Sequence, residues 1–129
     1  MKKILVIEDD LVTRNLHTRI LDDQGYAVVS TANGPDGITL AMREKPNLIV
    51  LDLGLPSPKA NSVEFDGYAV MRWLKRSATT NGIPVVVATA WPANVAREQS
   101  LGLGAAAFLT KPIRPEDLRT TVRILMDDY

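Results

Sequence analysis

The sequence predicts an α/β fold, a three-layer sandwich in which one parallel sheet is covered by helices on both faces. Short apolar runs alternate with segments of helical periodicity along the whole chain, which is typical of successive β-α units. The runs at 4–7, 48–51 and 85–88 are apolar without alternation, as expected for parallel strands buried on both faces. The length of 129 residues suits a single domain.

The first half of the chain predicts three strands and two helices. The expected strands are residues 3–7, 26–31 and 47–51, and the expected helices are residues 11–24 and 35–45. Val12, Leu16 and Ile20 recur at four-residue spacing, which predicts the apolar face of the first helix. Gly25 would end this helix, and Pro35 suits the first turn of the next one.

The second half predicts two strands and three helices. The expected helices are residues 67–77, residues 93–101 and a last one from Pro115, and the expected strands are residues 83–88 and 105–109. Val70, Trp73 and Leu74 predict the buried side of the third helix. The buried stripe expected for the last helix is Leu118, Val122 and Leu125.

Composition limits the classes of partner. Lysine and arginine together number 15, as do aspartate and glutamate, so net charge gives no argument for nucleic acid or an anionic membrane as partner. The chain has no cysteine, which excludes disulfides and thiolate metal sites. No apolar stretch approaches the roughly 18 residues of a membrane-spanning helix. We therefore expect a cytoplasmic protein with neither a nucleic-acid nor a membrane partner.

Polar side chains follow four of the expected strands. Glu8 and Asp9 follow the first strand, Asp52 the third, Thr89 the fourth and Lys111 the fifth. Because parallel strands end at a common edge, a carboxylate pair, a lone carboxylate, a hydroxyl and an ammonium would meet there. In open α/β sheets ligands bind at that edge. The pattern therefore predicts one functional site.

Six short motifs occur in order along the chain. They are Ile-Leu-Val-Ile-Glu8-Asp9-Asp10, Leu51-Asp52-Leu53, Leu55-Pro56, Asp66-Gly67, Val87-Ala88-Thr89-Ala90 and Phe108-Leu109-Thr110-Lys111-Pro112. Through them the chain resembles response-regulator receiver domains, the CheY-like phosphoacceptor modules of two-component signalling. The resemblance covers residues 1–129 as one receiver domain. It implies a flavodoxin-like (βα)5 fold with a five-stranded parallel sheet in the order 2-1-3-4-5, and a cis peptide between Lys111 and Pro112.

The predicted cofactor is Mg2+. This hard ion prefers six oxygen ligands at near-octahedral angles and keeps several waters. Asp9 and Asp52 would bind it directly, and Glu8 would act through water. Gly54 would supply its backbone carbonyl, because it lies two residues past Asp52 in the turn. Clustered carboxylates repel one another, which by itself makes the pocket a cation site.

The predicted chemistry is phosphoryl transfer onto Asp52. A carboxylate nucleophile would form an acyl phosphate, with a phosphohistidine on a sensor histidine kinase or histidine phosphotransfer protein as donor. Lys111 would pair with one phosphoryl oxygen and the hydroxyl of Thr89 would bond another. Thr89 would thereby move and Phe108 would rotate inward. A downstream protein would read the surface of the fourth helix, fifth strand and fifth helix.

Several residues have simpler interpretations. Asp10 is expected to cap the first helix, His17 to lie on its solvated face, and Trp91 either to pack within its loop or to contact a partner. Residues 57–65 form an insertion relative to the family, either a tolerated loop or a lid beside Asp52. Arg114 stands where a capping residue is expected, which should weaken the start of the last helix.

Two other classes of protein stay open as alternatives. A small aspartyl-phosphate phosphatase or phosphotransferase would need a second acid near Asp52, but Leu53 and Gly54 follow it. We therefore expect no enzyme beyond a chain that assists its own phosphorylation and dephosphorylation. A flavodoxin-like nucleotide binder would need a glycine-rich loop after the first strand, where the acids at 8–10 stand instead. A degenerate receiver that serves only as a scaffold is disfavoured by the intact set of residues.

Overall fold

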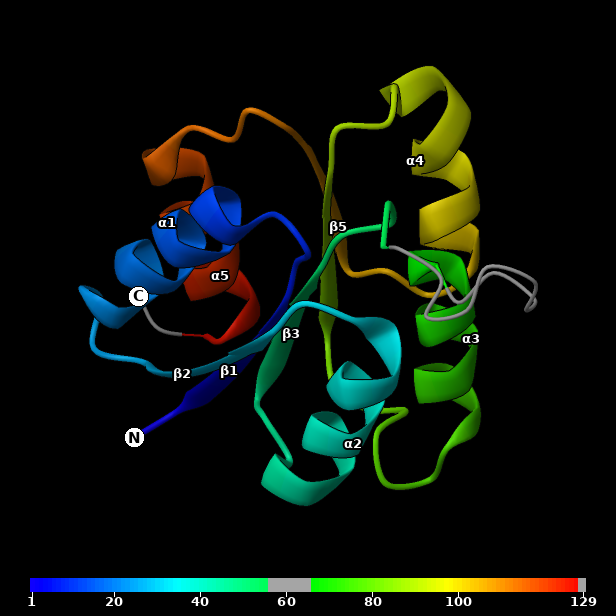
Figure 1. The fold of residues 1–129 in the computed structure, drawn as a ribbon, viewed down its shortest axis with the longest axis horizontal. Helices are drawn as coiled ribbons and strands as arrows, with labels where there is room; N and C mark the ends of the chain where they lie inside the picture. Colours follow the sequence, from blue (N-terminus) through cyan, green and yellow to red (C-terminus); the bar gives the residue numbers. More distant parts are fainter. Residues whose placement is uncertain (56–65, 128–129) are drawn as a thin grey trace.

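The structure is a computed structural model that describes residues 1–55 and 66–127, so the predicted insertion at 57–65 lies outside the described residues. In the described part, five strands form one parallel sheet in the order β2-β1-β3-β4-β5 (Figure 1). They are β1 (Lys3–Ile7), β2 (Ala27–Thr31), β3 (Leu48–Leu51), β4 (Val85–Thr89) and β5 (Ala107–Thr110). The predicted fold and strand order are confirmed.

Helices cover both faces of this sheet. They are α1 (Leu11–Asp22), α2 (Gly34–Glu44), α3 (Gly67–Arg76), α4 (Ala93–Gly102) and α5 (Pro115–Leu125). Figure 1 shows α1 and α5 on one face, with α2, α3 and α4 on the other. Of the helices in the described residues, none is long and apolar enough to cross a membrane.

The core lies in two layers, one on each face of the sheet. Alternate residues of β1 enter different layers: Leu5 and Ile7 pack with α2, α3 and α4, whereas Ile4 and Val6 pack with α1 and α5. All four are fully buried. Burial of each such side chain contributes on the order of 1.5–3 kcal/mol. The same alternation in β3 and β4 explains why these strands are apolar throughout.

The prediction placed the buried face of α1 on the wrong side of the helix. Val12 is 74% exposed and Leu16 is 48% exposed, whereas His17 is only 2% exposed and lies beside buried Ile20 and Leu21. The expectation that His17 lies on a solvated face is therefore also wrong. At 100° per residue, positions 17, 20 and 21 share the face that packs on the sheet, and the sequence places a histidine at one of these core positions.

The third and last helices agree with the sequence more closely. Val70 and Leu74 are buried in α3, but Trp73 lies at the edge of that face and is partly exposed. In α5, Leu118 and Val122 are buried and Leu125 packs against the same cluster. Sequence periodicity thus identified the buried side of both helices and overestimated only the burial of a large aromatic ring at its margin.

Helix and strand ends differ from the predictions by only a few residues. β4 and β5 each end one residue later than expected, so Thr89 is the last residue of β4. The Asp10 cap of α1 is confirmed, because its carboxylate accepts the Thr13 N–H. Arg114 makes no side-chain cap at the start of α5, as predicted.

The start of α3 lies directly against the end of β3. A Cβ atom on Gly67 would stand 2.4 Å from the Cα of Leu53 and 2.5 Å from the carbonyl oxygen of Asp52. Neither backbone atom can move out of the way cheaply, so only glycine permits this approach. The Gly67 N–H also donates to the carbonyl of Leu53 at 2.9 Å. α3 therefore supports the segment that presents Asp52.

Candidate functional site

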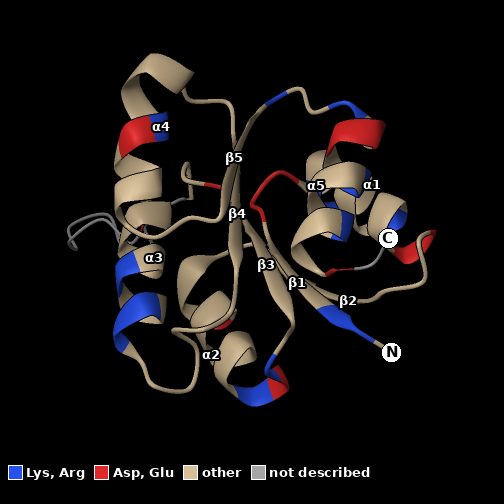
Figure 2. Cartoon of the chain, turned by 180° about the vertical axis from the view of Figure 1, so that it is seen from behind, with Lys and Arg blue, Asp and Glu red and all other residues tan. Residues whose placement is uncertain are grey.

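The carboxyl ends of β1 and β3 bring three carboxylates together. One carboxylate oxygen each of Glu8, Asp9 and Asp52 lies within 4.8 Å of the others. Glu8 and Asp52 are buried, whereas Asp9 is exposed. In Figure 2 the acidic residues occupy the connection from β1 to α1, at the edge of the sheet. Residues 43 positions apart in the chain thus face one another, as the strand-end pattern predicts.

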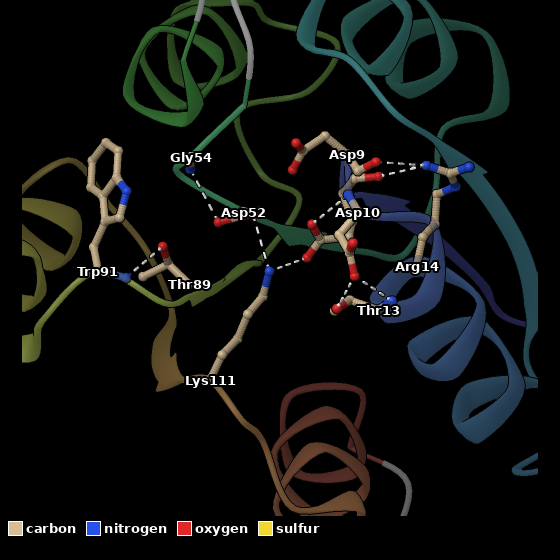
Figure 3. A network of polar contacts seen from close by, with 10 residues as sticks. Asp9, Asp10, Thr13, Arg14, Asp52, Gly54, Thr89, Trp91 and Lys111 are labelled. Atoms are coloured by element: carbon tan, nitrogen blue, oxygen red, sulfur yellow. Dashed lines mark hydrogen bonds and ion pairs between the residues drawn. The ribbon is translucent and has the colours of Figure 1, made fainter.

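Lys111 joins this cluster from the end of β5. Its ammonium donates hydrogen bonds to the carboxylate of Glu8 and, at 3.1 Å, to Oδ2 of Asp52 (Figure 3). Its backbone N–H donates to the carbonyl of Thr89 at 2.8 Å, and the Lys111–Pro112 peptide is cis, as the resemblance implies. Burial opposes the charged ammonium, but the two carboxylates outweigh it and raise the pKa of Lys111. The side chain is therefore a fixed cation.

The carboxyl of Glu8 has a raised pKa. Burial raises the pKa of its carboxyl to about 7, and the neighbouring Asp52 adds to the rise, although hydrogen bonds from Lys111 and the Asp10 N–H oppose it. The physical cause is the loss of water around a carboxylate that one ammonium only partly compensates. A second cation would favour the ionised form, so cation binding here would release a proton.

Asp52 is fixed by bonds to both of its carboxylate oxygens. Oδ1 accepts the Gly54 N–H at 3.1 Å, and Oδ2 accepts from Lys111. Its backbone N–H donates to the carbonyl of Ile7, which extends the β1–β3 pairing by one residue. The side chain is 9% exposed, so it is oriented by the fold and still reachable from solvent.

Thr89 and Trp91 lie on the β4 side of the site. The Thr89 side chain is buried, and its Oγ1 accepts the Trp91 N–H at 3.2 Å (Figure 3). The Trp91 ring is 5.6 Å from that of Tyr68, and its Nε1 would be 3.4 Å from a Cβ on Gly54. These contacts favour the loop-packing interpretation of Trp91. Phe108 is buried in the core layer beneath, as expected of a core aromatic.

Two further residues lie near the acids: Asp10, which caps α1 as predicted, and Arg14, which the sequence did not single out. Asp10 turns toward α1, where its carboxylate accepts both the N–H and the hydroxyl of Thr13, and these bonds lower its pKa. Arg14 was not singled out from the sequence, yet its guanidinium donates to the backbone carbonyl of Glu8 at 2.9 Å. A guanidinium–carbonyl contact has no sequence signature beyond an arginine in the first turn after the acids.

His17 borders a groove beside the site. The groove has a volume of about 290 Å³ and is lined by Thr13, Leu16, His17, Ala90, Lys111, Pro112 and Ile113. Burial lowers the pKa of His17, and the charge of Lys111 acts in the same direction. A neutral imidazole is therefore favoured at this position.

The carboxylate cluster fits a hard divalent cation. Its donors are oxygens, which suit Mg2+, and within the described residues the three acids are paired with one ammonium, that of Lys111, so acids outnumber cations in the cluster. Gly54 contributes its N–H to Asp52, and the role of its carbonyl stays a prediction.

Comparison with known sequences places the chain among signalling modules. A family model described as "Response regulator receiver domain" matches residues 4–123. PilH of Pseudomonas aeruginosa is 29% identical over 126 residues, with 98% of both chains covered. The "DNA-binding dual master transcriptional regulator RpaA" of Synechocystis is 36% identical over 98% of this chain and 49% of RpaA. The chain thus spans about half the length of RpaA and of the ycf27 regulator of Cyanophora paradoxa, of which it covers 48%.

Solved structures agree in fold. The signal receiver domain of a signal transduction histidine kinase from Syntrophus aciditrophicus matches with a TM-score of 0.85 and 31% identity, over 98% of this chain and 91% of that one. The receiver domain of a sensor histidine kinase from Pseudomonas aeruginosa PAO1 matches with a TM-score of 0.85 and 25% identity, over 98% of both chains. The latter structure has a magnesium ion coordinated in its active-site cleft.

Proposed function

We propose, since the chain belongs to the response-regulator receiver domain family of two-component systems, that it accepts a phosphoryl group on Asp52 in the presence of Mg2+. The observation that carries this proposal is the gathering of Asp9, Asp52 and Lys111 at one edge of the sheet. The phosphodonor is a phosphohistidine of a sensor histidine kinase or a histidine phosphotransfer protein.

In the proposed reaction a carboxylate oxygen of Asp52 attacks phosphorus. A new O–P bond forms as the P–N bond of the phosphohistidine breaks, and the imidazole nitrogen leaves with the electron pair. Lys111, already bonded to Oδ2 of Asp52, is placed to bind a phosphoryl oxygen. Thr89 supplies a hydroxyl for another. Positioning and charge neutralisation account for most of the catalysis in such transfers.

Mg2+ would offset the repulsion between the carboxylates and the incoming phosphoryl group. Asp9 and Asp52 are its proposed direct ligands, Glu8 acts through water and Gly54 offers its carbonyl. The oxygen-only donor set and the spacing of the three acids support this assignment. The magnesium ion in the active-site cleft of the histidine-kinase receiver domain from Pseudomonas aeruginosa PAO1 supports Mg2+ as the cofactor independently.

The proposed output is a change of the α4–β5–α5 surface. Thr89 moves toward the phosphoryl group, Phe108, already buried in this structure, rotates further inward, and a downstream cytoplasmic protein binds the altered surface. Exposed apolar side chains on α4 and α5, among them Val95 and Ile124, support protein binding there. In this scheme the chain turns over no external substrate, because apolar Leu53 and Gly54 follow Asp52 where a hydrolase would need its second acid.

Incubation with acetyl phosphate and Mg2+, read by intact mass, tests the proposal. We expect one phosphoryl adduct, which disappears in Asp52→Asn and after chelation of the metal. An equal adduct in Asp52→Asn would place the chemistry at another residue. Many turnovers of small phosphate esters per chain would favour the aspartyl phosphatase alternative.

A further inference from the structure

One side chain of α1 holds the backbone of the acidic connection between β1 and α1. Nη1 of Arg14 donates to the carbonyl oxygen of Glu8 at 2.9 Å and to that of Asp9 at 3.4 Å (Figure 3). The backbone N–H of Arg14 donates to the carbonyl of Asp10 at 2.8 Å. Three successive carbonyl groups, those of residues 8–10, therefore accept hydrogen bonds from the same residue.

These bonds determine which way the connection faces. With the carbonyls of Glu8 and Asp9 turned toward Arg14, the two carboxylates are left on the side of Asp52, where the three acids meet. The remaining backbone contacts agree with this orientation, since the Glu8 N–H donates to Thr31 and the Asp10 N–H donates to the Glu8 carboxylate. Mutual repulsion of the acids favours opening of this arrangement, and the guanidinium opposes it.

The guanidinium of Arg14 holds this backbone without forming ion pairs with the acids. Among residues 1–55 and 66–127, no carboxylate lies within ion-pair distance of Arg14, which instead donates to neutral carbonyl oxygens. Arg14 therefore blocks none of the acidic oxygens. A lysine at this position would place a compact ammonium on a flexible stem, in place of the Nη1 of a planar guanidinium that both carbonyls share.

We propose that Arg14 is a positioning residue for the magnesium site, because it fixes the backbone of Glu8 and Asp9 so that their carboxylates meet that of Asp52. This inference rests on the proposed function, since it concerns the affinity of that site for Mg2+. Residues that orient metal ligands from behind typically change metal affinity by roughly 10–100-fold when they are removed.

The test compares three variants of the full chain. Arg14→Met keeps the length of the stem and removes the donors, Arg14→Lys keeps the charge, and Arg19→Met is the matched control on the exposed side of α1. Titration with MgCl2, followed by backbone amide shifts in NMR spectra, gives the dissociation constant. We expect Mg2+ to bind roughly tenfold more weakly to Arg14→Met, to Arg14→Lys with intermediate affinity, and to Arg19→Met as to the wild type.

Hydrogen exchange of the metal-free chain provides a second measurement. The amides of Asp9 and Asp10 should exchange faster in Arg14→Met than in Arg19→Met, while amides of β3 stay unchanged. A purely structural role would lower the free energy of unfolding in urea but leave the Mg2+ affinity of the folded chain equal to that of Arg19→Met, and this result would overturn the inference.

The two proposals fail in different ways. Phosphorylation of wild-type Asp52 with unchanged Mg2+ affinity in Arg14→Met would remove the role of Arg14 and leave the proposed function intact. Absence of Mg2+ binding to the wild type would refute the proposed function. In that case equal exchange rates of Asp9 and Asp10 in both variants would also overturn the positioning role of Arg14.

Discussion

The connections after β1 and after β4 meet at the same site but are held very differently. Asp10 caps α1, because its carboxylate accepts two hydrogen bonds from Thr13. Arg14 donates to the backbone carbonyl of Glu8, just before the helix. α4 begins after Pro92, which makes no side-chain cap. Within the described residues, its connection is held at the site by the hydrogen bond from the Trp91 N–H to the hydroxyl of Thr89 and by packing of the Trp91 ring against Tyr68.

This difference separates two tasks. The β1–α1 side presents carboxylates, which in the proposed function must be arranged before a cation or phosphoryl group arrives. The β4–α4 side carries Thr89, whose proposed movement must reach the surface of α4. α4 begins without a side-chain cap, and its connection is hydrogen-bonded to Thr89, so the helix is suited to change position when Thr89 moves. The molecule therefore combines a fixed acidic half, whose backbone is held by side-chain hydrogen bonds, with a half whose helix begins without a side-chain cap.

Lys111 contacts both halves, and its removal should have the largest effect. Lys111→Ala deletes the ammonium that bonds Glu8 and Asp52. Mg2+ should still bind, because the three carboxylates remain, but the rate of adduct formation with acetyl phosphate should fall by about 100-fold, as for other preorganised charges. Timed intact-mass measurements give this rate, and normal activation of the variant would remove the proposed role of the ammonium.

The fixed half should show a pH dependence that comes from Glu8. Its pKa is raised from 4.5 to about 7 in the folded chain, so the folded state binds the proton more tightly than the unfolded state does. Its contribution to stability is complete below pH 4.5 and is lost as the pH rises through 7, with a slope of at most about 1.4 kcal/mol per pH unit. Glu8→Gln should flatten this slope in urea unfolding.

Glu8 should also make the Mg2+ affinity depend on pH. Mg2+ affinity should fall as the pH drops below 7, because Glu8 then holds a proton that the cation must displace. The affinity of Glu8→Gln should change less over this range. A steeper dependence in the variant than in the wild type would contradict the assignment to Glu8.

His17 should act in the opposite direction. Burial lowers its pKa below 6.5, so the unfolded chain binds the proton more tightly. Its contribution to stability is complete above pH 6.5 and is lost as the pH falls toward the lowered value. His17→Leu fits the same core position and should remove this loss, and unfolding in urea between pH 5 and 7 in a Glu8→Gln background isolates the effect. An unchanged slope would refute it.

Strand ends and helix faces were not equally predictable from the sequence. The meeting of Glu8, Asp52 and Lys111 was predictable, because apolar runs mark the strands and parallel strands end at a common edge. The phase of α1 was not predictable from Val12 and Leu16, since apolar residues at four-residue spacing also occur on an exposed helix face. Packing on the sheet, which a local pattern does not contain, decided the outcome.

Contacts between backbone and side chain were also beyond the sequence. The bond from Arg14 to the carbonyl of Glu8 depends on the path of the chain between β1 and α1. The raised pKa of Glu8 depends on how completely neighbouring segments exclude water. Residue types at strand ends thus predict which groups meet, whereas their protonation and orientation depend on the assembled structure.

Removal of the cap on the fixed half should have a moderate effect. Asp10→Ala deletes both bonds to Thr13 and should lower the free energy of unfolding by about 1 kcal/mol, the usual cost of losing an N-cap. Urea unfolding at pH 8 measures it. Mg2+ binding should persist, because Asp10 is turned away from the acids; loss of binding in a folded variant would place Asp10 among the metal ligands.

Adding a cap at the start of α4 should have the smallest effect on stability. It tests most directly whether the two halves differ in how firmly their helices are held. Pro92 has φ −59° and ψ 138°, an extended conformation that serine adopts at an N-cap. Pro92→Ser should raise the free energy of unfolding by roughly 0.5 kcal/mol at most, because serine can bond a free N–H of the first turn while the proline's restriction of the unfolded chain is lost. If few restraints on α4 permit the switch, the variant should form the Asp52 adduct normally but shift the amide resonances of α4 less on phosphorylation. Shifts equal to those of the wild type would show that the start of α4 does not limit the response.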